Sequence, residues 1–380
     1  MTVAINLKTL KQLIYIVILL GFGLGVQAQN VPTVGTDSTI EMANWNIEWL
    51  GSSGNGPSNE ALQLSNAVAV INKSKIDLWG LCEISSQASW DSLLARCPEY
   101  GGVISTWSQE QKTALMYKKS MFRVLYQKHP LGVYELEFAG GRLPLEVGLE
   151  LNMGSWKDTV YAFVIHLKAN TGSTTQKADA WDRRKRSSEA LKDYLDAWGK
   201  WKKTIVLGDW NDDVDKSIFS NYATPFSAFV ADTSRYAYST RNLSLTGQTS
   251  TTSYSDMIDH QCVSKRLANS MVGTSASVFK LQAYITSYSS TTSDHYPVYT
   301  VFKFQKPVVQ QNGVEALLPL YPQFYWNGSQ FVFEDGIQRE YAVYDLMGRE
   351  VSNIESGKYY VLQFADHGGI YRVKTCVIHE

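Results

Sequence analysis

The chain has 380 residues, of which 44% are hydrophobic and 19% charged, and its formal net charge is −1. This much apolar surface excludes a disordered chain, and the lack of a glycine or heptad repeat excludes collagen-like and coiled-coil proteins. At about 150 residues per domain, the length predicts two or three domains. The near-zero charge by itself gives no indication of a polyanionic partner.

The N-terminus predicts an exported protein. Lys8 and Lys11 precede an apolar run that ends in small residues at Val26-Gln27-Ala28. A basic start, a short apolar stretch and small residues before a cleavage point are typical of a secretory signal peptide. The run is shorter than the ~20 residues of a membrane-spanning helix. We therefore expect residues 1–28 to be a signal peptide and the protein to be secreted or on the cell surface, without a stable membrane span.

Strand-like and helical patterns alternate over residues 36–304. The strand-like runs are Ile40–Asn46, Ile76–Cys82, Ala114–Tyr117, Phe122–Tyr126, Leu145–Leu151, Thr159–His166 and Thr204–Leu207. Helical spacing covers Asn59–Ile71 and Lys177–Trp198, and the aromatic stripe of the second fits a core better than a base-stacking surface. Strands interspersed with helices predict a layered α/β sandwich.

The composition changes at residues 305–313, which read as a linker. Beyond it, residues 314–380 contain short strand-like pieces separated by turns and predict a small β-sandwich-like domain. Within that domain, Tyr341–Val351 and Gly368–Val373 resemble the C-terminal sorting domain of type IX secretion cargo, although the expected basic final residues are missing. The resemblance implies the secretion machinery as a partner, and an ordinary β appendage is the alternative.

Polar and ionisable side chains stand at the ends of the apolar runs. They are Asn46, Glu83, His166, Asp209, Asn211, Asp259, Asp294 and His295. Each of them alone is more often a turn former or a helix cap. If the strands lie side by side, however, these ends converge on one rim, where the oxygen ligands suit a hard divalent cation and the histidines suit proton transfer.

The motifs around these residues resemble, in order, the endonuclease/exonuclease/phosphatase superfamily, which includes deoxyribonuclease I. They are Trp45-Asn46-Ile47, Leu81-Cys82-Glu83, Ile165-His166-Leu167, Gly208-Asp209-Trp210-Asn211, Ile258-Asp259-His260 and Ser293-Asp294-His295. The resemblance implies a four-layer α/β/β/α sandwich with the active site at one edge of the paired sheets. It also implies a metal-dependent phosphodiester hydrolase that uses Mg²⁺ or Mn²⁺, with Ca²⁺ as a further candidate.

The resemblance further implies a metal site and a set of catalytic residues. Glu83, helped by Asn46 and with Asp294 nearby, is expected to hold the metal.

The expected catalytic residues lie on both sides of the phosphate. Asp209 and Asn211 position water and phosphate oxygens, and His166 binds the phosphate from the other side. His295, oriented by Asp259, is a general base or an electrostatic partner. Phosphoryl transfer needs this combination of charge neutralisation and a positioned nucleophile.

Three arginines are candidate phosphate ligands. Arg142 matches an Arg-x-Pro segment found in many members of the superfamily, and a surface arginine is the alternative. Arg183 and Arg184 belong to a basic run on a helix, where each residue turns by about 100°, so the run cannot all face one groove. A solvated helix face is the alternative for them. In deoxyribonuclease-like members, a glutamate before the strand that corresponds to Ala114–Tyr117 pairs with the first histidine, which corresponds to His166. In this chain, Glu110 and Gln111 straddle the position of that glutamate.

The leading functional hypothesis is a secreted, monomeric nuclease of low sequence specificity that hydrolyses DNA, RNA or both. One alternative is a phospholipid or sugar-phosphate phosphoesterase. It would need an exposed apolar loop, which the Ser/Thr/Tyr-rich stretch 219–295 does not offer. Another alternative is an inactive surface protein that uses the scaffold for binding.

Overall fold

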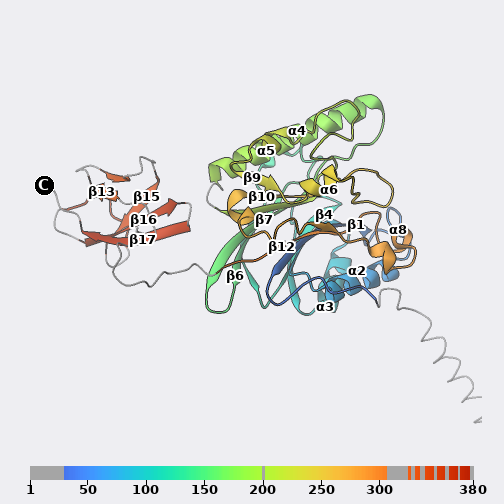
Figure 1. The fold of residues 1–380 in the computed structure, drawn as a ribbon, viewed down its shortest axis with the longest axis horizontal. Helices are drawn as coiled ribbons and strands as arrows, with labels where there is room; N and C mark the ends of the chain where they lie inside the picture. The colour runs from blue at the N-terminus through green and yellow to red at the C-terminus, as the bar shows by residue number, and fades with distance from the viewer. Residues whose placement is uncertain are drawn as a thin grey trace, which may run out of the picture. The chain divides into compact units, whose positions relative to one another are not determined.

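The computed structural model describes residues 30–198, 202–305, 324–326, 330–333, 339–345, 349–355, 359–366 and 369–376. The expected signal peptide and residues 306–313 of the expected linker lie outside this set. The chain divides into a larger unit, residues 1–192 and 204–304, and a smaller one, residues 193–203 and 305–380 (Figure 1). Within the described ranges, no helix is long and apolar enough to cross a bilayer.

Two six-stranded sheets form the larger unit. The strands of the first are β1 (Ile40–Leu50), β2 (Leu78–Ile84), β3 (Tyr100–Ile104), β4 (Lys112–Lys118), β11 (Ser277–Val278) and β12 (Val298–Phe302). The strands of the second are β5 (Phe122–Lys128), β6 (Leu145–Asn152), β7 (Lys157–His166), β8 (Lys203–Asp209), β9 (Tyr236–Tyr238) and β10 (Asp259–Ser264). Their orders are β11-β12-β1-β2-β4-β3 and β5-β6-β7-β8-β10-β9. β1 runs parallel to β2 and antiparallel to β12.

The helices lie between the strands along the chain. They are α2 (Glu60–Ser74), α3 (Gln87–Arg96), α4 (Thr174–Trp198), α5 (Ser227–Ala231), α6 (Arg241–Leu245), α7 (Lys265–Ala268) and α8 (Tyr288–Thr291), with 3₁₀ turns η1 (Gly132–Tyr134) and η2 (Leu281–Ala283). The predicted helix over 59–71 is confirmed as α2, which begins where the Asn59 side chain accepts from the amide of Leu62 at 3.1 Å. The second predicted helix is confirmed as α4.

The alternation of side chains along β1 explains the layers. Ala43, Trp45 and Ile47 belong to the core between the first sheet and α2 and α3. Ile40 and Met42 point the other way, into the core between the two sheets. Figure 1 shows α4 and α5 on the far side of the second sheet. These layers form the predicted four-layer α/β/β/α sandwich.

The smaller unit contains a C-terminal β region. β13 (Phe324–Trp326) pairs with β14 (Phe331–Phe333), and β15 (Tyr341–Tyr344), β16 (Tyr359–Asp366) and β17 (Gly369–Cys376) form a three-stranded antiparallel sheet. Phe333, Leu362 and Phe364 are buried together in its apolar cluster. The expected small β domain is therefore present, and its role in sorting stays a prediction.

Candidate active site

The site begins where the apolar face between the sheets becomes polar. Along β1, Asn44 and Asn46 continue the face that starts with Ile40 and Met42, because alternate residues share a face. The amide of Asn44 donates to the carbonyl oxygen of Gly208 at 3.1 Å. The Asn46 amide nitrogen donates to Glu83 Oε1 at 3.0 Å and to Asp209 Oδ2 at 3.1 Å. A single side chain thus joins a carboxylate from each sheet.

Glu83 is the metal ligand that the sequence predicts, and it is almost fully buried near the end of β2. Its second oxygen, Oε2, accepts a hydrogen bond from the amide of Trp49 at 3.1 Å. Burial raises the pKa of Glu83, and the hydrogen bond from Asn46 opposes that rise. The carboxylate is therefore held in one orientation at a place where a cation would stabilise its charge.

Gly208 brings Asp209 to the same point from the second sheet. Its φ is +142°, and a Cβ there would lie 2.0 Å from the carbonyl oxygen of Ile165, so this approach requires glycine. Asp209 Oδ1 then accepts from the amide of Asn211 at 2.9 Å, while the Asn211 side chain donates to the carbonyl oxygen of Leu167 at 3.1 Å. Burial raises the pKa of Asp209 to about 7.

Both predicted histidines face Asp209. His166 Nε2 lies 3.5 Å from Asp209 Oδ2 and 3.7 Å from Glu83 Oε1. His295 Nε2 lies 3.9 Å from Asp209 Oδ2, and its Nδ1 is 2.7 Å from Asp259 Oδ2. The structure therefore brings together two imidazoles and three carboxylates from separate parts of the chain.

The surroundings drive the two histidines toward opposite charge states. Burial, reinforced by the guanidinium of Arg142, holds the pKa of His166 well below its ordinary value. Burial also opposes the charged form of His295, but Asp259, Asp209 and Asp294 outweigh it and raise the pKa of His295 well above its ordinary value. These opposite shifts favour the neutral form of His166 and the charged form of His295. Paired groups with separated pKa values are typical of acid–base sites.

Glu48 is a further acidic residue of the site, which sequence reasoning missed. Its Oε2 accepts a hydrogen bond from the backbone amide of Asp294 at 2.9 Å. Burial, followed by the charge of Asp294, raises the pKa of Glu48 to about 7. The only signal in the sequence was a carboxylate in the same strand-end motif as Asn46. Asp294 itself is half-exposed, with Oδ1 3.8 Å from His295 Nε2.

The side chains fit a hard divalent cation. The possible ligand atoms of Asp209, Asp259 and His295 lie within 4.8 Å of one another, and His295 can bind a cation only when its ring is neutral. Burial raises the pKa values of Glu48, Glu83 and Asp209, and a bound cation would relieve this cost of their charge. Asn46 plays a different part from the one expected: its nitrogen faces the carboxylates and its Oδ1 accepts from the amide of Glu48 at 2.9 Å. In this arrangement Asn46 orients Glu83.

Arg142 belongs to the site. Its Nη1 lies 3.0 and 2.9 Å from the two ring nitrogens of His166, and its Nη2 donates to the carbonyl oxygen of Leu167 at 2.9 Å. The same Nη1 donates to Gln111 Oε1 at 2.8 Å. Gln111 therefore contacts Arg142, and Arg142 in turn lies beside His166, whereas Glu110 is exposed.

Arg184 does not reach the site, so its expected role as a phosphate ligand is wrong. It is fully buried, donates to Asp212 Oδ2 at 2.8 and 3.1 Å, and donates to the carbonyl oxygen of Lys168 at 2.7 Å. The 3.6-residue period of α4 places it on the buried face with Ala180 and Leu191. This ion pair ties α4 to the loop after β8.

Arg183 lies next to Arg184 in α4 but is only half-buried. It donates to the carbonyl oxygen of Leu136 and lies 3.7 Å from Asp179. Its charge contributes to lowering the pKa of Lys168, after burial. Arg183 therefore lies beside the segment that follows His166, and its role toward a phosphate stays a prediction.

Comparison with known proteins identifies the fold. No family model and no curated protein matches the sequence. Solved structures do: humanized TDP2 from D. rerio matches at 14% identity over 70% of this chain and 100% of that chain, with a TM-score of 0.51. An endonuclease/exonuclease/phosphatase from Bacteroides vulgatus matches at 14% identity over 71% of this chain and 100% of that chain, with a TM-score of 0.52. The larger unit therefore has the endonuclease/exonuclease/phosphatase fold.

Proposed function

We propose that this chain is a divalent-metal-dependent phosphoesterase and, more specifically, a secreted nuclease of low sequence specificity. The observation that carries the proposal is the convergence of Glu83 and Asp209 with a neutral His166 and a charged His295. A bound divalent cation would neutralise charge on the phosphate oxygens. Glu83, Asp209 and the nearby Glu48 and Asp294 are the residues that would hold it.

The protein's own groups supply the remaining chemistry. His295, kept protonated by Asp259, stabilises negative charge that develops on the reacting phosphate. His166 and Arg142 form the opposite wall, where the guanidinium attracts a phosphate oxygen. Asn211 is fixed by its backbone amide, which donates to Asp209, and by its side chain, which donates to the carbonyl oxygen of Leu167. This division matches the needs of an in-line displacement at phosphorus.

Nuclease activity is supported by the basic groups beside His166 and by the expected export, which gives access to external DNA and RNA. Zymography with both polymers in Mg²⁺ tests it. We expect cleavage that EDTA and Glu83→Ala abolish, whereas Glu99→Ala, on an exposed surface, leaves it intact. A folded protein that degrades neither polymer would rule out the nuclease assignment.

One observation favours a phospholipid phosphoesterase as the second candidate. The segment before Arg142 exposes 90% of Val133 and 61% of Leu136, while Phe138 is fully buried and anchors it. The amide of Phe138 donates to the carbonyl oxygen of Tyr134 at 3.0 Å, so the segment is an ordered turn. Exposed apolar side chains beside a polar site suit a substrate in a lipid surface.

The two candidates differ in how they depend on this turn. If the substrate is a phospholipid, Val133→Ser combined with Leu136→Ser lowers hydrolysis of sphingomyelin vesicles and leaves hydrolysis of a soluble inositol phosphate unchanged. If the substrate is a nucleic acid, the protein hydrolyses DNA or RNA. It then hydrolyses neither sphingomyelin nor inositol phosphate at a useful rate. An inactive binding protein would hydrolyse none of them.

We also propose that residues 1–28 direct export and that residues 314–380 engage the secretion machinery, with the protein acting as a monomer. The support is the sequence pattern of both ends. Fractionation of cells expressing the full chain and a version truncated after residue 313 tests it. If the full chain and the truncated chain are secreted equally, the C-terminal domain has no role in sorting.

A further inference from the structure

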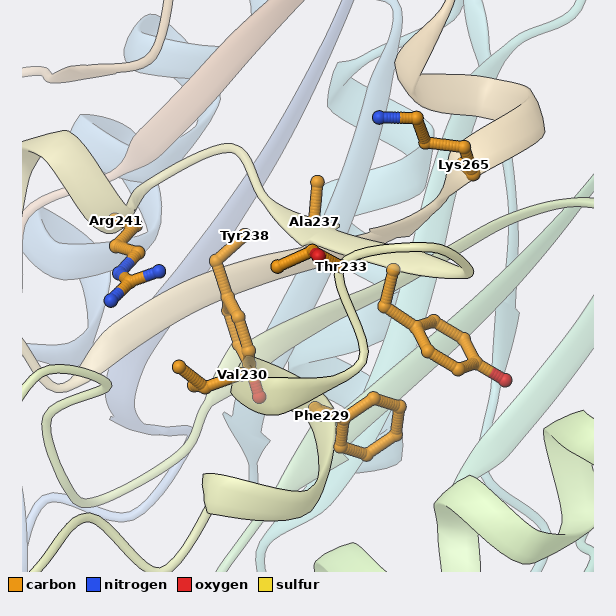
Figure 2. A pocket seen from close by; sticks show the side chains of 8 residues that line it. Phe229, Val230, Thr233, Ala237, Tyr238, Arg241 and Lys265 are labelled. Carbon is orange, nitrogen blue, oxygen red and sulfur yellow. The ribbon is translucent and has the colours of Figure 1, made fainter.

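A second concave site lies at the edge of the second sheet, formed by residues to which the proposed phosphoesterase assigns no role. It is a pocket of about 180 Å³ beside β9 (Figure 2). Its lining comes from α5, the turn after α5, β9 and the first residues of α6 and α7: Phe229, Val230, Thr233, Tyr236, Ala237, Tyr238, Arg241 and Lys265. β9 is the terminal strand of its sheet, so among the residues that the structure describes no further strand covers the edge at which this pocket lies.

One wall of the pocket is aromatic and held in place from behind. Phe229 and Tyr238 are buried and meet the ring of Trp210 edge-on, at centroid distances of 6.2 and 5.3 Å. Phe229 also meets Tyr236 edge-on at 4.9 Å. Because Trp210 is itself fully buried, these rings have little freedom to move. The wall is therefore preformed for a flat apolar group.

The charged side chains that line the pocket are both positive. Arg241 and Lys265 are both exposed, and neither has an ion-pair partner within the part of the chain that the structure describes. Figure 2 shows their side chains on either side of Ala237 and Tyr238. Asp232, in the adjoining turn, is already 3.0 Å from Lys192 and 2.6 Å from Arg235. The positive charge at the mouth is therefore available to a ligand.

We propose that this pocket binds a small aromatic anion, meaning one planar ring that carries a carboxylate or a phosphate group. A cavity of roughly 150 Å³ accommodates a benzene ring, so a volume of about 180 Å³ holds one ring with a small substituent. The ring packs on Phe229 and Tyr238, and the anionic group lies toward Arg241 and Lys265. Two cations and one apolar wall discriminate against neutral aromatics and against ring-free anions.

Isothermal titration of the full chain in EDTA tests this assignment without any activity measurement. The probes are benzoate and phenyl phosphate, with benzyl alcohol and acetate as controls that lack the charge or the ring. We expect saturable binding of both probes and much weaker binding of both controls. Failure of this test leaves the proposed phosphoesterase function untouched, because the catalytic residues take no part in it.

Variants locate the binding. Arg241→Gln combined with Lys265→Gln should weaken benzoate binding by about tenfold or more, since two charge-assisted contacts are lost. Val230→Phe, which fills the pocket, should abolish it. Lys119→Gln, an exposed lysine on another surface, and Arg142→Gln, in the phosphate site, should have no effect. The proposal is overturned if benzoate does not bind, if the pocket variants bind it normally, or if Arg142→Gln weakens it equally.

Discussion

The side-chain amide of Gln63, on α2, donates to the backbone carbonyl oxygen of Glu48 at 2.7 Å and also to that of Ile47 at 2.8 Å. The same nitrogen lies 3.1 Å from the carbonyl oxygen of Thr292. Glu48 and Trp49 both have positive φ angles, 55° and 53°, which non-glycine residues adopt at a cost of about 1–3 kcal/mol each. Gln63 therefore stabilises the strained segment after Asn46 and ties it to the loop before Asp294.

Replacing Gln63 by leucine should loosen the acidic cluster. We expect Gln63→Leu to weaken Mn²⁺ binding by about tenfold, because groups that orient metal ligands have effects of this size. Electron paramagnetic resonance of free Mn²⁺ measures the binding, and thermal melting shows whether the protein is folded. Asn66→Leu is the matched control, since the Asn66 amide reaches Thr291 and Thr292 but not the Glu48 segment. Equal losses in both variants would contradict a specific role for Gln63.

Glu83→Gln should remove catalysis while keeping the fold. The amide has the same shape but no charge, so it cannot hold a cation strongly. We expect phosphoesterase activity to fall by about a hundredfold or more and Mn²⁺ binding to weaken in parallel. Glu99→Gln, on the exposed surface, should behave like the unmodified chain. Retained activity in Glu83→Gln would place the metal site elsewhere.

Asp259→Asn should lower the pKa of His295. The carboxylate of Asp259, 2.7 Å from His295 Nδ1, is the largest influence that raises this pKa against burial. Without it, the imidazolium loses its proton at a lower pH. An NMR titration of the metal-free protein measures the shift, with His295→Gln used to assign the resonance among the 6 histidines. An unchanged pKa would show that Asp209 and Asp294 suffice to charge the ring.

Substitutions of Arg142 and Arg184 should have different effects, one on activity and the other on the free energy of unfolding. Arg184→Met leaves Asp212 as an unpaired buried charge and should lower the free energy of unfolding by about 3–5 kcal/mol. Arg142→Met should reduce activity with a much smaller effect on unfolding. Lys185→Met breaks only a surface pair with Glu189 and should cost less than about 1 kcal/mol. Urea unfolding and activity assays on the three variants test the assignment, which fails if Arg142 carries the larger stability loss.

Glu41 should make stability pH-dependent far from the active site. Burial, together with Asp77, raises the pKa of Glu41 to about 7 from 4.5. Between these values the folded state keeps a proton that the unfolded state releases, so stability falls as pH rises across this window. Glu41→Gln cannot titrate and should reduce the decline, by on the order of 2 kcal/mol. Identical pH profiles of urea unfolding for the two proteins would show that Glu41 stays ionised in the fold.

Much of this site could be predicted from the sequence because its residues follow apolar strands. Asn46, Glu83 and Asp209 each come at the end of such a run, and strand pairing brings the ends of neighbouring strands to one edge. These local patterns predict a layered α/β sandwich with a cation site at that edge. The four layers were implied by the resemblance of the ordered motifs to a known superfamily.

Only the tertiary structure decided which side chains point into the site. Arg142 and Arg184 are both close to His166 in sequence or in predicted position. The packing of α4 nevertheless directs Arg184 into the core, where it pairs with Asp212. The loop before β6 directs Arg142 toward the imidazole of His166. The contact between Gln63 and the Glu48 segment likewise depends on how α2 is seated on the first sheet. Side-chain direction follows from contacts between distant segments, which no local pattern records.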